Sequence, residues 1–202
     1  MGLPSQGNAR RTPHAWRQIS ATSGSASGKS FVAKVLEAEG CPVLSADRVG
    51  HEVLVNEASA EVLEAFGTLD RKALAAIVFA DPAELRRLNA LLYPHIFARQ
   101  EAWFASLSAP VAVVEAAVMI EAGSHVRYDK IILTMCTEAQ QVARALARGG
   151  STEHDVRQRL SRQLPLEEKR KFADYVIDTS GTEAWTREQT IRVYTELLAL
   201  AA

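Results

Sequence analysis

The stretch that decides the fold runs from Ile19 to Asp47 and reads ISATSGSASGKSFVAKVLEAEGCPVLSAD. A short apolar segment enters a Gly/Ser-rich turn, and Gly28-Lys29-Ser30 then opens an amphipathic run. This layout is typical of a phosphate-binding loop, in which small residues let several backbone N–H groups face one phosphate. The N-terminus of the following helix adds unpaired donors and partial positive charge. We therefore expect Lys29 to reach the β- and γ-phosphates, and the Ser30 hydroxyl to help hold Mg²⁺.

The loop departs from the consensus G-x-x-x-x-G-K-[ST], because Ser23 occupies the first glycine position. Glycine there often serves a backbone conformation that a residue with a Cβ adopts less readily. A flexible Ser/Gly turn between a strand and a helix is the alternative interpretation. Asp47 speaks against that alternative, because it follows the next apolar segment, where open α/β sheets place ligand-binding groups.

Composition excludes several classes of protein. The 202 residues fit one domain, or one domain with insertions, and the net charge of −1 argues against a general nucleic-acid binder. Since no apolar run reaches about 18 residues, we expect no membrane span. Cys41 and Cys136 lack metal-ligand spacing, so we expect them to be reduced and buried in a cytoplasmic protein. Residues 1–16 carry no apolar core, and we interpret them as a disordered extension.

The apolar pattern predicts buried strands alternating with helices, which indicates an α/β parallel sheet with crossover connections. We expect strands at 17–21, 42–44, 111–116, 130–135 and 175–177, and helices at 29–39, 137–147, 151–163 and 185–200. Between the second and third strands, residues 48–108 are expected to be helical throughout. Asp81-Pro82 is a helix start, with Asp as N-cap and Pro at the first position, and Tyr93-Pro94 should kink or break that helix.

Further blocks follow the loop in a recognisable order. These are TSGSASGKS (22–30), VLSAD (43–47), LNALLYPHI (88–96), EAAVMIEAG (115–123), and QLPLEEKR through ADYVIDTSG (163–181). With these blocks the chain resembles the dephospho-coenzyme A kinases, the P-loop enzymes of the last step of coenzyme A biosynthesis. The resemblance extends from about Ile19 to Trp185.

The resemblance implies an organisation of the chain. It implies a P-loop NTPase-like, five-stranded parallel sheet flanked by helices, with a helical substrate-binding insertion and a helical lid. The nucleotide-binding core would comprise residues 17–47, 109–143 and 172–202, the insertion 48–108 and the lid 144–171. The donor would be ATP with Mg²⁺, and the acceptor the ribose 3′-hydroxyl of dephospho-CoA. We expect a cytoplasmic monomer or weak homo-oligomer with no nucleic-acid or membrane partner.

The resemblance also implies roles for individual residues. Lys29, Asp47 and Arg148 would be catalytic and Ser30 would be a metal ligand. ATP would be bound by Gly24, Ser25, Ala26, Ser27, Gly28, Lys29, Ser30, Phe31, Arg148, Thr179 and Gly181. Dephospho-CoA would be bound by Asp47, Arg71, Leu88, Asn89, Pro94, Glu121 and Arg159.

Physical reasoning qualifies these roles. A free Asp has a pKa of about 3.9, so Asp47 is expected to orient the hydroxyl and accept its proton late; a helix N-cap is the alternative. Glu115 is either an acidic partner to water on Mg²⁺ or a buried structural carboxylate. The segment 144–171 holds eight basic and four acidic residues. We interpret this excess of positive charge as a lid that closes over ATP and brings an arginine to the developing negative charge. For any single arginine a solvated surface position is the alternative.

Other departures from the family pattern keep two further functions open. Ser23 and Ala26 replace loop glycines, which leaves a nucleotide- or CoA-binding protein with little turnover as an alternative. Ser45 replaces the first aspartate of the family's D-A-D, and Tyr93 replaces the histidine before Pro94. These two changes leave a P-loop kinase with another small-molecule acceptor as a second alternative.

Overall fold

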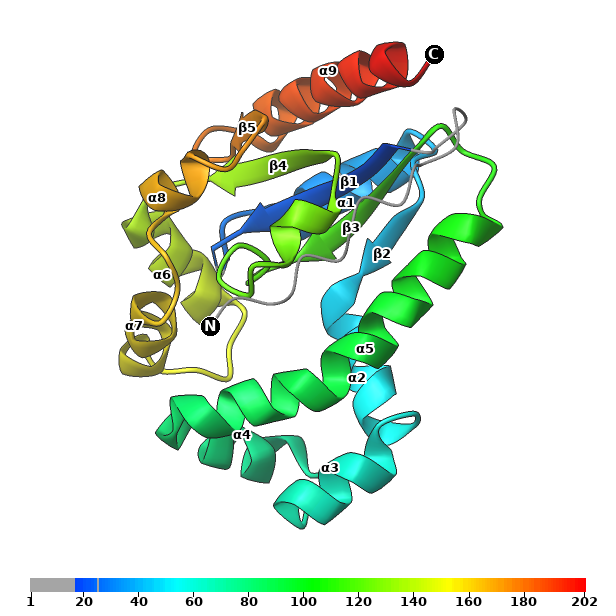
Figure 1. The fold of residues 1–202 in the computed structure, drawn as a ribbon. Helices are drawn as coiled ribbons and strands as arrows, with labels where there is room; N and C mark the ends of the chain where they lie inside the picture. Colours follow the sequence, from blue (N-terminus) through cyan, green and yellow to red (C-terminus); the bar gives the residue numbers. More distant parts are fainter. Residues whose placement is uncertain (1–16, 25) are drawn as a thin grey trace.

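The predicted parallel sheet is confirmed. The computed structural model describes residues 17–24 and 26–202, and within them five strands form one sheet in the order β2-β3-β1-β4-β5. The strands are β1 (Arg17–Ser23), β2 (Val43–Ser45), β3 (Val111–Ala116), β4 (Lys130–Met135) and β5 (Tyr175–Asp178), and each neighbouring pair is parallel. Figure 1 shows β1 at the centre, with β3 and β4 beside it. The extension predicted at 1–16 lies outside the described residues.

Alternate side chains of the central strands pack into different cores, because successive residues of a strand point to opposite faces. Ile19, Val111 and Val113 pack with residues of α1 (Lys29–Ala38) and α9 (Glu183–Ala201) on one face. Ala112 and Val114 pack against a second cluster on the other face. Residues 111–114 are completely buried, as expected of a strand covered on both sides.

The second cluster belongs to a helical lobe that leaves the sheet after β2 and returns as β3. Its helices are α2 (Ala46–Val55), α3 (Ser59–Phe66), α4 (Arg71–Ala80) and α5 (Pro82–Ser106). Asp81 Oδ1 accepts a hydrogen bond from Ala83 N at 2.7 Å, so the predicted helix start at Asp81-Pro82 is confirmed. Figure 1 shows this lobe below the β2 edge of the sheet.

A second group of helices connects β4 to β5. These are α6 (Glu138–Ala147), α7 (Glu153–Ser161) and the short α8 (Leu166–Arg170), which the apolar pattern did not predict. A 3-10 turn, η1 (Ser124–Arg127), precedes β4. Figure 1 shows α7 across from α4 and the first turns of α5. None of the helices in the described part of the chain has the length and apolar character to cross a membrane.

Two expectations from the sequence are wrong in part. Tyr93-Pro94 does not break the helix, because α5 runs through Pro94 to Ser106. The apolar face continues past the proline, with Ile96 and Phe104 buried in the helical lobe, and this packing maintains the helix.

The second expectation concerns the two free cysteines, which were both expected to be buried. Cys41 is buried, and burial raises the pKa of its thiol to about 12, whereas Cys136 is only partly buried.

The proline inside α5 gives a stability prediction. Pro94 lacks the N–H that would bond to the carbonyl four residues earlier, and it is exposed. We expect Pro94→Ala to raise the free energy of unfolding by about 1–3 kcal/mol, measured by urea denaturation. As a matched control, Ala98→Pro introduces the same defect at another exposed position of α5 and should lower it by about 3 kcal/mol. A Pro94→Ala protein no more stable than the wild type contradicts this account.

Candidate active site

The carboxyl ends of the central strands open into a cavity of about 240 Å³, which we call the phosphate-loop cavity. The loop between β1 and α1 forms one wall, through Gly24, Ala26, Ser27 and Gly28. The lining is completed by Ser23, Lys29, Ser30, Ser45, Asp47, Glu115, Ala117 and Arg148. Eight residues predicted from the sequence therefore meet here, namely Gly24, Ala26, Ser27, Gly28, Lys29, Ser30, Asp47 and Arg148. Ser25 lies outside the described residues.

Side-chain hydroxyls hold the loop in place. Ser27 Oγ donates to Gly24 O at 3.0 Å and lies 3.0 Å from Thr134 Oγ1 of β4. Thr179 Oγ1, just after β5, donates to Ser27 O at 2.8 Å. These hydrogen bonds connect the loop to β4 and to the residue that follows β5. The backbone amides of the loop are therefore held in position before an anion binds.

Glycine is required at position 28 for two reasons. Gly28 has φ +90°, a left-handed conformation that L-residues disfavour. A Cβ built there would lie 2.9 Å from the Thr179 side chain. Gly28 therefore permits both the turn into α1 and the close approach of Thr179.

The two replaced loop glycines differ in their backbone consequences. Ser23 is a completely buried residue of β1, and it is not among the positive-φ residues. Ala26 has φ +58°, the only positive φ at a non-glycine position in the described residues. A left-handed alanine costs about 1–2 kcal/mol, and burial of its methyl group beside Val142 and Val156 offsets part of that cost.

Lys29 is the centre of a charge cluster. Its Nζ lies 3.9 Å from Asp47 Oδ2 and 3.4 Å from Glu115 Oε1, while Ser30 Oγ donates to Glu115 Oε1 at 3.2 Å. The side chains of Lys29 and Glu115 are 11% and 13% exposed, whereas that of Asp47 is 68% exposed. The Asp47 carboxylate is therefore open to an incoming ligand.

Asp47 is not the cap of its helix. Ser45 occupies the N-cap position of α2, and its Oγ accepts a hydrogen bond from Arg48 N at 3.4 Å. The N-cap interpretation of Asp47 is therefore wrong. Ser45, a departure from the family pattern, performs that structural task and also lines the phosphate-loop cavity.

A second cavity of about 310 Å³, the Thr179 cavity, adjoins the first through Gly28 and Arg148. Phe31, Thr179 and Gly181, all predicted from the sequence, line it together with Arg144. Arg144 Nη1 donates to Thr179 Oγ1 at 3.1 Å and Nη2 donates to Thr179 O at 2.6 Å. Arg144 was not among the predicted site residues, although its spacing of four from Arg148 places both on one helix face.

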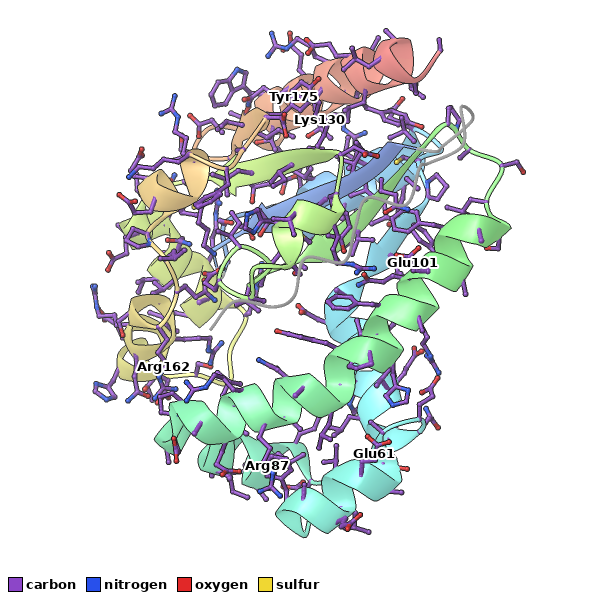
Figure 2. All side chains as sticks on the ribbon, viewed as in Figure 1. Glu61, Arg87, Glu101, Lys130, Arg162 and Tyr175 are labelled. Carbon is purple, nitrogen blue, oxygen red and sulfur yellow. The ribbon has the colours of Figure 1, made fainter. Side chains whose placement is uncertain are left out.

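A third cavity, of about 750 Å³ and larger than the other two, separates the helical lobe from α7, and we call it the α5–α7 cavity. Asn89, Glu121 and Arg159 line it, as does Tyr93, whose pKa is raised by burial. Figure 2 shows Arg162, another lining residue, at the end of α7 near the first turns of α5. Its lining comes from helices that precede β3 in the sequence and from segments that follow β3. A cavity formed between separate helices is a common site for a large ligand.

Three predicted substrate-binding residues are absent from the described lining of these cavities. Leu88 packs against the core of the helical lobe, while Arg71 and Pro94 are exposed. The resemblance placed all three in the helical insertion that contributes to the substrate site, but helical periodicity presents Asn89 and Tyr93, not Leu88 or Pro94, to the cavity.

The family model and the curated relatives that match this chain carry the same name. The family model for dephospho-CoA kinase matches residues 17–184. A dephospho-CoA kinase from Parasynechococcus marenigrum is 42% identical, covering 82% of this chain and 88% of that protein. One from Geobacter sulfurreducens is 39% identical, covering 81% and 90%. The crystal structure of TT1252 from Thermus thermophilus is 31% identical, with a TM-score of 0.84, and covers 90% of this chain and 97% of that one.

Two glycines with positive φ give a matched pair of substitutions. Gly40 has φ +83° with nothing near a built Cβ, whereas Gly28 also faces Thr179. We expect Gly40→Ala to cost about 1–2 kcal/mol of stability without changing ATP binding. Gly28→Ala should lower ATP affinity at least about tenfold, because a Cβ displaces the loop or Thr179. Calorimetric titration with Mg·ATP measures the ATP affinity of the two variants, and equal affinities would contradict this role of Gly28.

Proposed function

The chain belongs to the dephospho-CoA kinase family, and we propose that Lys29, Asp47 and Arg148 carry out its phosphoryl transfer. The protein is an ATP-dependent kinase that phosphorylates a hydroxyl group of dephospho-CoA. The observation that carries the residue assignment is the cluster in which Lys29 lies within 4 Å of both Asp47 and Glu115, at the mouth of a fixed loop.

ATP is assigned to the two adjoining cavities. The phosphates occupy the phosphate-loop cavity, where loop amides and the N-terminus of α1 supply donors. The adenosine occupies the Thr179 cavity, against Phe31 and Gly181. The support is that Gly28 and Arg148 line both, so one elongated ligand can extend from one to the other.

Mg²⁺ fits the oxygens present beside the loop. Ser30 Oγ and Glu115 Oε1 are hard ligands 3.2 Å apart, and no cluster of three or more acidic, His or Cys side chains forms a metal cage in the described residues. That combination suits a cation held by few protein groups together with phosphates and water. Ser30 would hold the ion directly and Glu115 through water. The ion would neutralise charge on the transferred phosphate.

Dephospho-CoA is assigned to the α5–α7 cavity, whose volume suits a ligand of this size. Val78, Leu85 and Val118 give it an apolar wall for the aliphatic arm of the substrate. Arg159 and Arg162 face the same space and match the charge of its diphosphate. Asn89 and Glu121 supply polar contacts that fix orientation.

The reaction itself needs positioning and charge neutralisation. The phosphates compete with Asp47 and Glu115 for the Lys29 ammonium, which leaves the exposed Asp47 carboxylate available to the acceptor hydroxyl. Asp47 orients that hydroxyl and takes its proton as the hydroxyl oxygen bonds to the γ-phosphorus of ATP, while the bond from that phosphorus to the ADP oxygen breaks and ADP leaves. Arg148 stabilises the negative charge on the transferring group, and residues 144–171 act as a lid that excludes water.

The remaining proposals concern the setting of the enzyme. We propose a cytoplasmic location, which the free thiols of Cys41 and Cys136 support. We propose that it acts as a monomer or weak homo-oligomer. A kinase for another acceptor is not favoured by the named relatives, and a panel of nucleosides and nucleotides in the kinase assay tests it.

The catalytic assignment is tested by coupled ADP release with dephospho-CoA. Lys29→Ala should lower kcat by about 10²–10³, because it removes a charge aimed at the transferred phosphate. Asp47→Asn should lower kcat by about 10²–10⁴ while ATP binding persists. Lys34→Ala, an exposed lysine on the same helix, is the control and should retain full activity. Wild-type protein without ADP release above background overturns the function, and an active Asp47→Asn protein overturns the role of Asp47.

The acceptor site is tested by two arginines of α7. Arg159 lines the α5–α7 cavity, whereas Arg157 pairs with Glu138 and Glu153 on the surface. Arg159→Ala should raise the KM for dephospho-CoA about tenfold through loss of a charge-assisted hydrogen bond. Arg157→Ala should change that KM by less than about twofold. Equal KM values for dephospho-CoA in the two variants would contradict the assignment of dephospho-CoA to the α5–α7 cavity.

A further inference from the structure

A lysine that has no individual role in the assignments above is completely buried between two of the cavities. Lys169, in α8, has no solvent exposure. Its Nζ donates to Ser23 O at 3.0 Å, to Ala117 O at 3.2 Å and to Glu121 Oε1 at 2.7 Å. An ammonium has three N–H donors, so these oxygens account for all of them.

The acceptors of Lys169 belong to two different sites. Ser23 and Ala117 line the phosphate-loop cavity, and Ser23 directly precedes the loop. Glu121 lines the α5–α7 cavity. One ammonium group therefore connects the start of the phosphate loop to the wall of the acceptor cavity.

Glu121 is oriented by the same contacts. Its Oε1 accepts from Lys169 Nζ and, at 3.1 Å, from Leu164 N. Its Oε2 is buried without a hydrogen-bond donor among the described residues. With one oxygen held, the carboxylate is fixed, and its second oxygen remains available for a donor from a ligand in the α5–α7 cavity.

The buried ammonium of Lys169 indicates a role beyond packing. Burial lowers the pKa of Lys169, the nearby Lys29 ammonium lowers it further, and the Glu121 carboxylate opposes both. Replacing a buried ion pair by apolar residues of similar volume is often neutral or stabilising. Packing alone therefore does not require an ammonium here, whereas fixing two carbonyls and a carboxylate does.

We propose that Lys169 is a positioning residue for phosphoryl transfer. It holds the beginning of the phosphate loop and the Glu121 carboxylate at a constant separation. The transferred phosphate of ATP and the acceptor hydroxyl of dephospho-CoA then lie at the distance and orientation that the reaction requires. The inference rests on the proposed function, because it assigns ATP to one cavity and dephospho-CoA to the other. A displacement of about 1 Å in such a site costs up to about 10²-fold in rate.

The test compares four variants in steady-state kinetics, with kcat expressed per folded molecule. Lys169→Met keeps the volume and removes the charge, and we expect kcat to fall about 10–100-fold and the KM for ATP to rise. Lys171→Met is the control, because Lys171 is exposed and pairs with Glu168 at the surface, and it should remain within about twofold of the wild type. Glu121→Gln alone should raise the KM for dephospho-CoA and leave the KM for ATP unchanged.

The fourth variant separates positioning from stability. Lys169→Met/Glu121→Gln removes both charges, so it should recover melting temperature lost in Lys169→Met but should not recover kcat. If Lys169→Met does not fold, the double variant alone decides. A folded variant without Lys169 that keeps wild-type kcat and KM for ATP overturns the proposal, as does recovery of kcat together with melting temperature. An inactive wild-type protein would instead overturn the proposed function.

Discussion

The ammonium of Lys29, held between Asp47 and Glu115, is the interaction on which the rest of the site depends. Those carboxylates come from the start of α2 and the end of β3, which lie far apart in the sequence. They meet because parallel strands deliver their carboxyl ends to the same edge of a sheet. The buried apolar residues of β1 and β3 fix that edge, so the core determines the distance between loop and carboxylate.

The loop tolerates its substitutions for reasons specific to each position. Ser23 lies within β1 and donates its hydroxyl to Gly24 O, so its side chain is part of the local hydrogen bonding. Ala26 retains the left-handed turn, and its methyl group contributes to a small cluster with α6 and α7. Gly28 is a glycine at the position where a Cβ would meet Thr179. The degenerate motif therefore retains the geometry that anion binding requires.

Much of this architecture could be predicted from the sequence, because apolar strands and a phosphate-loop pattern are local signals. The meeting of Lys29 with Asp47 also followed from the loop and the strand after it. Burial was harder to predict: Lys169 stands in the run EEKRK, where charge indicates surface, yet it is completely buried. Pro94 predicted a kink or a break, and the helix is not broken there, because α5 packs on the helical lobe on both sides of the proline. The residues that line the α5–α7 cavity depend on how α7 faces α5, which no local pattern encodes.

The most direct measurement is a crystal structure of the protein with a non-hydrolysable ATP analogue and dephospho-CoA. We expect the terminal phosphate to lie against Lys29 Nζ and the loop amides, with the ribose 3′-hydroxyl within hydrogen-bond distance of Asp47. We expect the rest of dephospho-CoA to lie in the α5–α7 cavity. A nucleotide bound away from the loop, or an acceptor hydroxyl remote from Asp47, would show that Lys29 and Asp47 do not carry out the transfer.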